Sequence, residues 1–268
     1  MNPLDRSSLK TKKGIPYFES PEIAEIDWIK HGFLTRQGGV SPSPFHSLNL
    51  GNETGDLPEH VSQNTDLLAN AFGIGTNRLI LLNQIHQDRI LLLRRPSPML
   101  PAHVEYDAVI TNSPDTFLGI RTADCLPILV VDQKLKVVAA IHAGRQGTAL
   151  HIGQKVLKKM RDEFGSLPED LLIALGPSVG PCCYEIDTKV FRPEWEPFST
   201  AQGMGKWALD IVGFNVSQLK KEGVEEDQIF RITLCTGCQQ DLFFSYRKEG
   251  RTGRQFSFIG IISEDRET

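Results

Sequence analysis

The chain has 268 residues, of which 40% are hydrophobic and 23% charged, which is ordinary usage for a globular protein that can bury a sizeable core. Its 29 basic and 33 acidic residues give a formal net charge of -4, so no overall basic field exists to hold a phosphate backbone, and nucleic acid is excluded as a main partner. The longest apolar runs end after about six residues, far short of the roughly 20 that span a bilayer, so no membrane segment is expected.

The N-terminal segment is polar and lacks the apolar stretch of a secretory signal. We therefore expect residues 1–15 to be a flexible tail, residues 16–268 to form a single α/β domain, and the protein to be cytoplasmic. Five cysteines, an odd number in a chain without such a signal, favour free thiols over a disulfide framework.

The predicted elements alternate between short strands and two long helices. The first helix is expected from Asp56 to Phe72, because Asp56 and Glu59 have the spacing of a capping box and Gly73 follows. The second is expected from Thr148 to Phe164, with Gly165 after it. Nine short apolar runs predict strands: residues 79–82, 90–93, 108–111, 117–120, 127–131, 137–141, 171–175, 230–234 and 256–262.

This order of elements predicts an α/β fold, a layered sandwich with a mixed β-sheet core and outer helices. A doubly wound parallel sheet fits less well. Several of the predicted strands follow one another without room for the dozen residues of a crossover helix.

Three residues near predicted strand ends form a candidate zinc site. His86 follows the strand at 79–82, Cys125 precedes the strand at 127–131, and His142 closes the strand at 137–141. Two imidazoles and one thiolate are ligands that zinc favours, and three protein ligands leave a fourth position for water or substrate. The neighbouring carboxylate of Asp124 is costly to bury without a partner, which also favours a site and makes Asp124 a candidate catalytic acid.

The same residues allow a different chemistry. Cys125 and His142 could form the nucleophile and base of a cysteine hydrolase, with Asp124 or Asn83 orienting the imidazole. Geometry separates the two hypotheses, because a metal needs all three ligands around one point, whereas a dyad needs only a hydrogen bond.

Two basic segments are candidate anion sites. Arg36 precedes the Gly38-Gly39 turn in TRQGGVSPS, and Arg247 lies in YRKEGRTGR with two further arginines. Guanidinium groups beside glycine turns can bind phosphate, so Arg36 and Arg247 are predicted substrate ligands. Asn83 is the third predicted substrate ligand.

Four further cysteines occur as Cys182-Cys183 and Cys235-x-x-Cys238. A four-cysteine zinc site is conceivable, yet adjacent cysteines seldom both face one tetrahedral ion. These residues are therefore predicted to be buried thiols.

Taken in order, the segments NQIHQD, DAVITN, RTADCLPILVV, AAIHAG, GPSVGPCCYEI and LCTG…FFSYRKEGRTGR resemble the laccase-domain family, also called polyphenol oxidase-like proteins. The resemblance implies zinc at His86, Cys125 and His142. It also implies phosphorolysis of the purine nucleosides adenosine, inosine and methylthioadenosine, accompanied by adenosine deaminase activity. A related role implied for bacteria is peptidoglycan editing, so a hydrolase acting on peptidoglycan precursors is the alternative. We expect a monomer or weak homodimer.

Two features qualify the resemblance. Multicopper oxidation is not expected, because such sites need many imidazoles and the seven histidines include no His-x-His pair. The family usually continues its HAG motif with Trp and Arg, whereas this chain has Arg145 and Gln146. An aromatic surface beside the purine is thereby lost.

Overall fold

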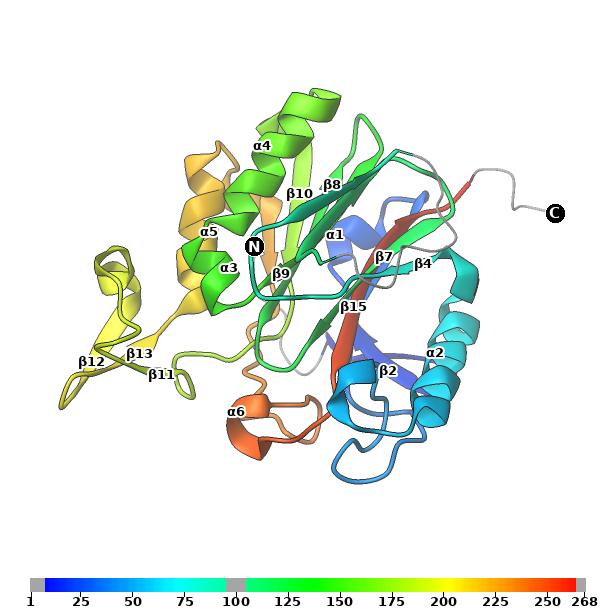
Figure 1. Ribbon diagram of the computed structural model, residues 1–268. Coiled ribbons are helices and arrows are strands. Elements are labelled where there is room, and N and C mark those ends of the chain that lie inside the picture. Colours follow the sequence, from blue (N-terminus) through cyan, green and yellow to red (C-terminus); the bar gives the residue numbers. More distant parts are fainter. Residues whose placement is uncertain (1–7, 95–104, 264–268) are drawn as a thin grey trace.

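Two six-stranded sheets lie face to face with helices on their outer surfaces (Figure 1). The structure, a computed structural model, describes residues 8–94 and 105–263. Strand order is β1-β2-β3-β15-β7-β4 in the first sheet and β14-β10-β8-β9-β6-β5 in the second, and both sheets mix parallel and antiparallel pairs. The layered α/β sandwich with a mixed β-sheet core and outer helices is confirmed.

The first sheet contains β1 (Lys10–Lys12), β2 (Ile15–Phe18), β3 (Ile29–Leu34), β4 (Leu79–Leu81), β7 (Thr116–Thr122) and β15 (Gln255–Ile261). The second contains β5 (Ile90–Leu93), β6 (Ala108–Thr111), β8 (Leu126–Asp132), β9 (Val137–Ala143), β10 (Leu171–Leu175) and β14 (Ile229–Arg231). A small third sheet consists of β11 (Glu185–Asp187), β12 (Ser199–Gly203) and β13 (Lys206–Leu209). The helices are α1 (Pro21–Ala24), α2 (Pro58–Phe72), α3 (Arg145–Ala149), α4 (Ile152–Phe164), α5 (Ile211–Lys221) and α6 (Tyr246–Glu249).

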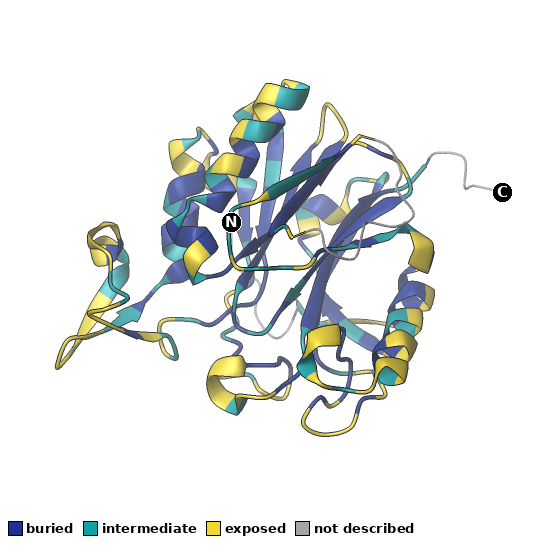
Figure 2. Ribbon diagram, in the orientation of Figure 1, coloured by how far each residue is buried: buried dark blue, intermediate teal, exposed yellow. Residues whose placement is uncertain are grey.

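The central strands are buried on both faces (Figure 2). On β8, Leu129 and Val131 pack into the layer between the sheets, whereas Ile128 and Val130 pack toward α4 and α5. Helix α2 covers the outer face of the first sheet through a cluster that includes Phe72. Burial on both faces explains why these strands are continuous apolar runs rather than alternating ones. Within the described residues, no helix has the length and apolar character needed to cross a bilayer.

Two predictions near the N-terminus need correction. Residues 10–12 and 15–18 form the antiparallel pair β1–β2, so they are not part of a flexible tail; residues 1–7 of the predicted tail lie outside the described residues. Helix α2 starts at Pro58, and Leu57 is its N-cap without a side-chain hydrogen bond. The carboxylate of Asp56 instead accepts from the Leu57 backbone N–H at 2.8 Å and contacts His60 Nδ1 at 3.0 Å. The helix ends at Gly73 as predicted.

The predicted helix from Thr148 to Phe164 is confirmed over α4, which ends at Phe164 with Gly165 as its C-cap, but its first residues belong to a separate helix, α3. The two helices meet at His151, whose φ of 60° is left-handed. The His151 ring nitrogen Nδ1 contacts Gln218 Nε2 of α5 at 2.9 Å. A contact from α5, which the sequence analysis did not predict, therefore accompanies the break.

Candidate active site

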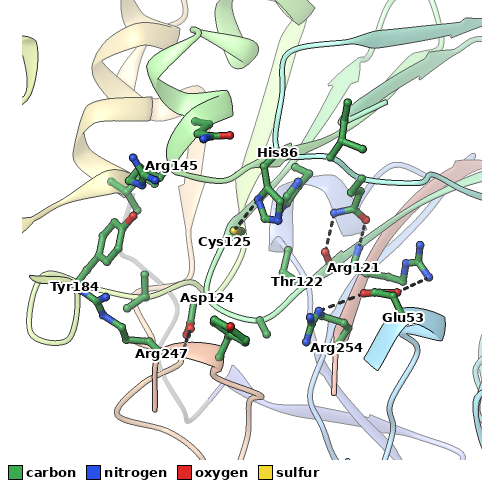
Figure 3. A pocket seen from close by; sticks show the side chains of 18 of the residues that line it. Glu53, His86, Arg121, Thr122, Asp124, Cys125, Arg145, Tyr184, Arg247 and Arg254 are labelled. Carbon is green, nitrogen blue, oxygen red and sulfur yellow. Dashed lines mark hydrogen bonds and ion pairs between the residues drawn. The ribbon is translucent and has the colours of Figure 1, made fainter. Parts of the chain in front are cut away.

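The three predicted metal ligands come together in space, and Figure 3 shows His86 and Cys125 side by side. His86 lies in the loop after β4, Cys125 directly precedes β8, and His142 is within β9. Their ligand atoms all lie within 4.8 Å of one another, and Cys125 Sγ is 3.9 Å from His86 Nδ1. His142 is buried and His86 exposed, so the cluster opens to solvent on one side.

A residue that the sequence analysis missed, Asp107, positions both histidines. Its buried carboxylate accepts a hydrogen bond from His142 Nδ1 at 2.8 Å and from the backbone N–H of His86 at 2.9 Å and of Gln87 at 2.7 Å. Burial alone would raise the pKa of Asp107, but the hydrogen bonds from His142 and Gln87 outweigh it and lower the pKa. Because Nδ1 of His142 donates to Asp107, Nε2 is left for a metal.

Cys125 and His142 polarise each other. Burial opposes charge on both groups, yet the charge of His142 lowers the pKa of the Cys125 thiol to about 6, and the charge of Cys125 raises the pKa of His142 to about 9. Thiolate is the form of cysteine that binds metals and acts as a nucleophile. The thiolate serves either of the two predicted chemistries, whereas His142 has to lose a proton before it can bind a metal.

Gly144 keeps the space between the ligands open. A Cβ atom at this position would lie 2.9 Å from Cys125 Sγ and 2.9 Å from His86 Nδ1, closer than real Cβ contacts allow. Two neighbouring residues have left-handed backbone: φ is 60° at His86 and 87° at Asp124. Such conformations cost about 1 to 3 kcal/mol and persist where the surroundings hold them. The two-nitrogen, one-sulfur donor set around this open space fits a zinc ion.

The triad lies in a cavity of about 820 Å³ that has basic residues on both sides (Figure 3). On one side, Glu53 lies 3.5 Å from Arg121 and 3.4 Å from Arg254, so an acid accompanies these two guanidinium groups. On the other side, Arg145 and Arg247 line the cavity together with Tyr184. The predicted substrate residues Asn83 and Arg247 therefore both lie in the cavity.

Asp124 is held by three hydrogen-bond donors from the C-terminal part of the chain. Its carboxylate accepts from Thr236 Oγ1, from Ser245 Oγ and from the backbone N–H of Arg247, each at 2.7 Å. The side chain that orients His142 is thus that of Asp107 rather than that of Asp124 or Asn83. Asp124 links the residue before Cys125 to the segments that carry Arg247 and Thr236.

Arg36 does not line the cavity, which corrects its prediction as a phosphate ligand. Its Nε donates to the His46 carbonyl at 2.8 Å, and its Nη1 donates to the Gln240 carbonyl at 2.9 Å and to Glu249 Oε1 at 2.8 Å. The buried guanidinium is therefore committed to joining two loops.

The four remaining cysteines are not buried thiols. Cys182 and Cys238 are exposed, Cys183 and Cys235 are half-buried, and all four sulfurs lie within 4.8 Å of one another. The expectation that adjacent cysteines would not face a common point is wrong.

The two residues that depart from the family's motif, Arg145 and Gln146, both line the cavity. Arg145 is the first residue of α3, and Gln146 Oε1 accepts from Gln87 Nε2 at 3.3 Å. The departure from the motif noted in the sequence therefore falls in the lining of the cavity.

In comparisons with known proteins, most of the chain matches one protein family, and several relatives match over most of their length. Residues 30–262 match the family described as Multi-copper polyphenol oxidoreductase laccase. A protein named purine nucleoside phosphorylase, from Deinococcus radiodurans, is 33% identical over 96% of this chain and 98% of its own. Purine nucleoside phosphorylase YfiH from Escherichia coli is 38% identical over 85% of this chain and 92% of its own. The crystal structure of YlmD from Geobacillus stearothermophilus matches with a TM-score of 0.87 and 30% identity, over 96% of this chain and 99% of that one.

Proposed function

This chain belongs to the laccase-domain family of purine nucleoside phosphorylases, and on that premise we propose that it is a zinc-dependent phosphorylase of adenosine, inosine and methylthioadenosine. The observation that carries the proposal is the cavity itself, in which a two-histidine, one-cysteine cluster lies beside two basic side chains, Arg145 and Arg247. Its volume is in the range of sites for small molecules.

His86, Cys125 and His142 would hold the zinc ion, with Asp107 fixing the orientation of His142. When bound, the ion would supply Lewis-acid polarisation of a substrate atom in the cavity. Gly144 supports this assignment, because a side chain there would fill the space between the ligands.

We assign phosphate to the side of Arg145 and Arg247. Glu53 already accompanies the cationic groups of Arg121 and Arg254, so the other wall attracts an anion more strongly. Tyr184 lies on this wall, and the Arg247 guanidinium is 5.5 Å from its ring. Burial raises the pKa of Tyr184 to about 12, so its hydroxyl stays protonated near neutral pH and can donate a hydrogen bond to substrate.

In phosphorolysis, a phosphate oxygen forms a bond to ribose C1′ as the bond from C1′ to the purine nitrogen breaks. Hydrogen phosphate brings the proton that the departing base takes up, so no further reactant is needed. The arginines orient the phosphate and balance its charge as positive charge builds on the sugar. Asp124, whose carboxylate accepts three hydrogen bonds, is assigned a positioning role in place of the acid role expected from the sequence.

Adenosine deaminase activity is proposed for the same cavity. Water would replace the amino group at C6 of adenosine, and ammonia would leave, giving inosine. This reaction consumes no phosphate, which separates it from phosphorolysis in an assay.

The test is to incubate inosine with the purified protein, with and without phosphate, and to measure free hypoxanthine. We expect release only with phosphate. Arg247→Gln should raise the KM for phosphate roughly tenfold or more, because hydrogen bonds to charged groups contribute about 1.5 to 3 kcal/mol. Arg94→Gln is the matched control, because Arg94 pairs with Glu163 on the surface outside the cavity. Phosphate-independent release would instead show that the nucleoside is hydrolysed. No release under either condition would favour the alternative, a hydrolase in which Cys125 and His142 act as nucleophile and base, with peptidoglycan precursors as substrates.

Elemental analysis of the purified protein tests the metal. Zinc is expected because the ligand set resembles three-ligand catalytic zinc sites. Blue-copper sites add a weak axial Met to a similar set, and among the described methionines Met160 packs in the core and Met204 is exposed. Copper at a matching stoichiometry would overturn the zinc assignment.

A further inference from the structure

We propose that Cys182, Cys183, Cys235 and Cys238 form a second metal site, a closed four-thiolate site for a structural zinc ion. All four sulfurs lie within 4.8 Å of one another, with Cys238 Sγ at 3.4 Å from Cys182 Sγ and 3.5 Å from Cys183 Sγ. Around one ion with bonds of about 2.3 Å, tetrahedral geometry separates the sulfurs by about 3.8 Å. The cluster therefore needs shifts of only a few tenths of an ångström for its closest pairs.

Backbone turns bring the adjacent cysteines to one point. The N–H groups of Cys183 and Tyr184 both donate to the Gly180 carbonyl, at 2.9 and 3.0 Å, which curls the chain at the Cys182–Cys183 pair. On the facing loop, the Cys238 N–H donates to the Cys235 carbonyl at 3.1 Å. This Cys-x-x-Cys spacing is typical of structural zinc sites.

Two glycines and one backbone donor complete the surroundings. A Cβ at Gly237 would lie 3.0 Å from Cys183 Sγ, and one at Gly180 would lie 3.6 Å from Cys182 Sγ, so small residues line both loops. The Gly180 N–H donates to Cys235 Sγ at 3.2 Å. Such donors around ligating atoms orient them and offset the charge of a thiolate.

The sulfur–sulfur distances do not favour any one disulfide pair. Disulfide sulfurs are about 2.05 Å apart, and Cys238 is nearly equidistant from Cys182 and Cys183. One cation would satisfy all four thiolates, whereas one disulfide would satisfy two. A set of four sulfurs selects zinc or iron, and with no open position the site is structural rather than catalytic.

The proposed site braces the wall of the active-site cavity. Its two loops reach Asp124 from both sides: the Val179 N–H donates to the Asp124 carbonyl at 2.9 Å, and Thr236 Oγ1 donates to its carboxylate. Tyr184, which lines the cavity, directly follows Cys183. The ion would therefore fix the side of the cavity opposite Glu53.

The experiment measures the zinc content of the purified full-length protein after expression in medium that contains zinc. We compare the unaltered protein, the Cys125→Ser variant, the Cys182→Ser/Cys238→Ser variant and a Gln240→Ser control on the same loop. The cysteine pair variant should hold one equivalent less than the unaltered protein, as should Cys125→Ser, and the two losses should add when combined. Gln240→Ser should lose none. Equal zinc in the unaltered protein and the pair variant overturns the proposal.

Thiol alkylation of the unaltered protein tests the site without any substitution that could unfold it. The cluster thiols, two of them exposed, should resist alkylation until a chelator is added. Protection that is removed by a reductant but not by a chelator would indicate a disulfide and overturn the proposal. Rapid alkylation of all four thiols in the zinc-loaded protein would also overturn it. Neither measurement depends on enzymatic activity, so their outcome is independent of the proposed phosphorylase reaction.

Discussion

Asp107 controls the orientation of both histidines with one carboxylate. Replacing it with Asn keeps the size but offers a single acceptor atom, so a hydrogen bond to His142 or to the loop of His86 is lost. We expect Asp107→Asn to weaken metal binding roughly 10- to 100-fold, as loss of a ligand's hydrogen-bond partner usually does. Competition with a chelator measures this. The control is Asp88→Asn, which breaks only an ion pair with Lys155 on the surface and should bind the metal as tightly as the unaltered protein does. If both variants bound the metal with similar affinity, Asp107 would have no part in the site.

Gly144→Ala tests the space between the ligands without removing any of them. The added methyl group would lie 2.9 Å from Cys125 Sγ and from His86 Nδ1, so we expect loss of the metal equivalent held there and a folded protein. Gly153→Ala in α4 is the matched control, since its methyl group would make an ordinary 3.4 Å contact with Leu219, and alanine favours the helix. Normal metal content in Gly144→Ala would place the ion elsewhere.

Arg145 and Gln146 test substrate choice. If a Trp at 145 stacks on the purine, Arg145→Trp should lower the nucleoside KM roughly two- to tenfold, because aromatic contacts contribute about 0.5 to 1.5 kcal/mol beyond burial. The same variant should raise the KM for phosphate, and adding Gln146→Arg should restore it by returning a guanidinium to the cavity. Steady-state kinetics with adenosine and inosine measure both constants. Unchanged constants would mean that neither position contacts substrate.

At this scale the sequence predicted that His86, Cys125 and His142 come together, because they lie at or near strand ends, and Asn83 lines the same cavity. It did not predict Asp107, although the carboxylate directly precedes a strand that pairs with the strand of His142. Arg36 was misassigned, since an arginine beside glycines has the same sequence pattern whether it faces a ligand or ties two loops together.

At the scale of elements, apolar runs located most of the central strands because those strands are buried on both faces. They missed β3, an interior strand of the first sheet, because Lys30, His31 and Gly32 interrupt its apolar pattern. Periodicity failed where tertiary contacts decide. The break between α3 and α4 at His151 coincides with a contact from α5, and no proline in the sequence marks its position. Strands β11, β12 and β13 were not predicted, because a small exposed sheet has no apolar run; the pattern in β12 is almost entirely exposed.

The junction of α1 and β3 makes stability depend on pH. His31 of β3 is buried, and its Nε2 accepts from the backbone N–H of Ser20, the N-cap of α1. Burial is the main cause that lowers the pKa of His31 from 6.5 to about 4. Below pH 6.5 the unfolded chain therefore takes up a proton that the folded protein does not. Stability contributed by neutral His31 is fully present above pH 6.5 and is lost as the pH falls toward 4, by roughly 2 to 3 kcal/mol.

Denaturant unfolding at several pH values between 4.5 and 8 measures this. His31→Gln should flatten the decline below pH 6.5, whatever its effect at pH 7. Between pH 7 and 8, where this histidine no longer takes up a proton, the free energy of unfolding should change with pH in the same way in both proteins. If the free energy of unfolding fell equally steeply below pH 6.5 in both proteins, His31 would not be the residue that causes the loss of stability.

For the whole molecule, the proposed metal site at His86, Cys125 and His142 joins the two sheets. His86 follows β4 of the first sheet, His142 belongs to β9 of the second, and Cys125 lies in the short link from β7 to β8 that passes between them. An ion bound to all three would cross-link the layers of the sandwich near one edge. Binding to the folded state alone raises stability by mass action, so function and fold stability should depend on the same ligands.

Removing the ion should therefore lower the melting temperature of the entire fold. With free metal at about 100 times Kd, binding contributes about 2.7 kcal/mol, and each kcal/mol shifts Tm by roughly 2 to 4 °C in a chain of this size. We expect a chelator to lower Tm by several degrees. To isolate the triad, the measurement uses the Cys182→Ser/Cys238→Ser background, in which the proposed second site is removed. In that background, adding Cys125→Ser should abolish the chelator-dependent shift, because a serine hydroxyl replaces the thiolate that connects the sheets. A shift that persists without Cys125 would mean that the stabilising ion is bound outside the triad.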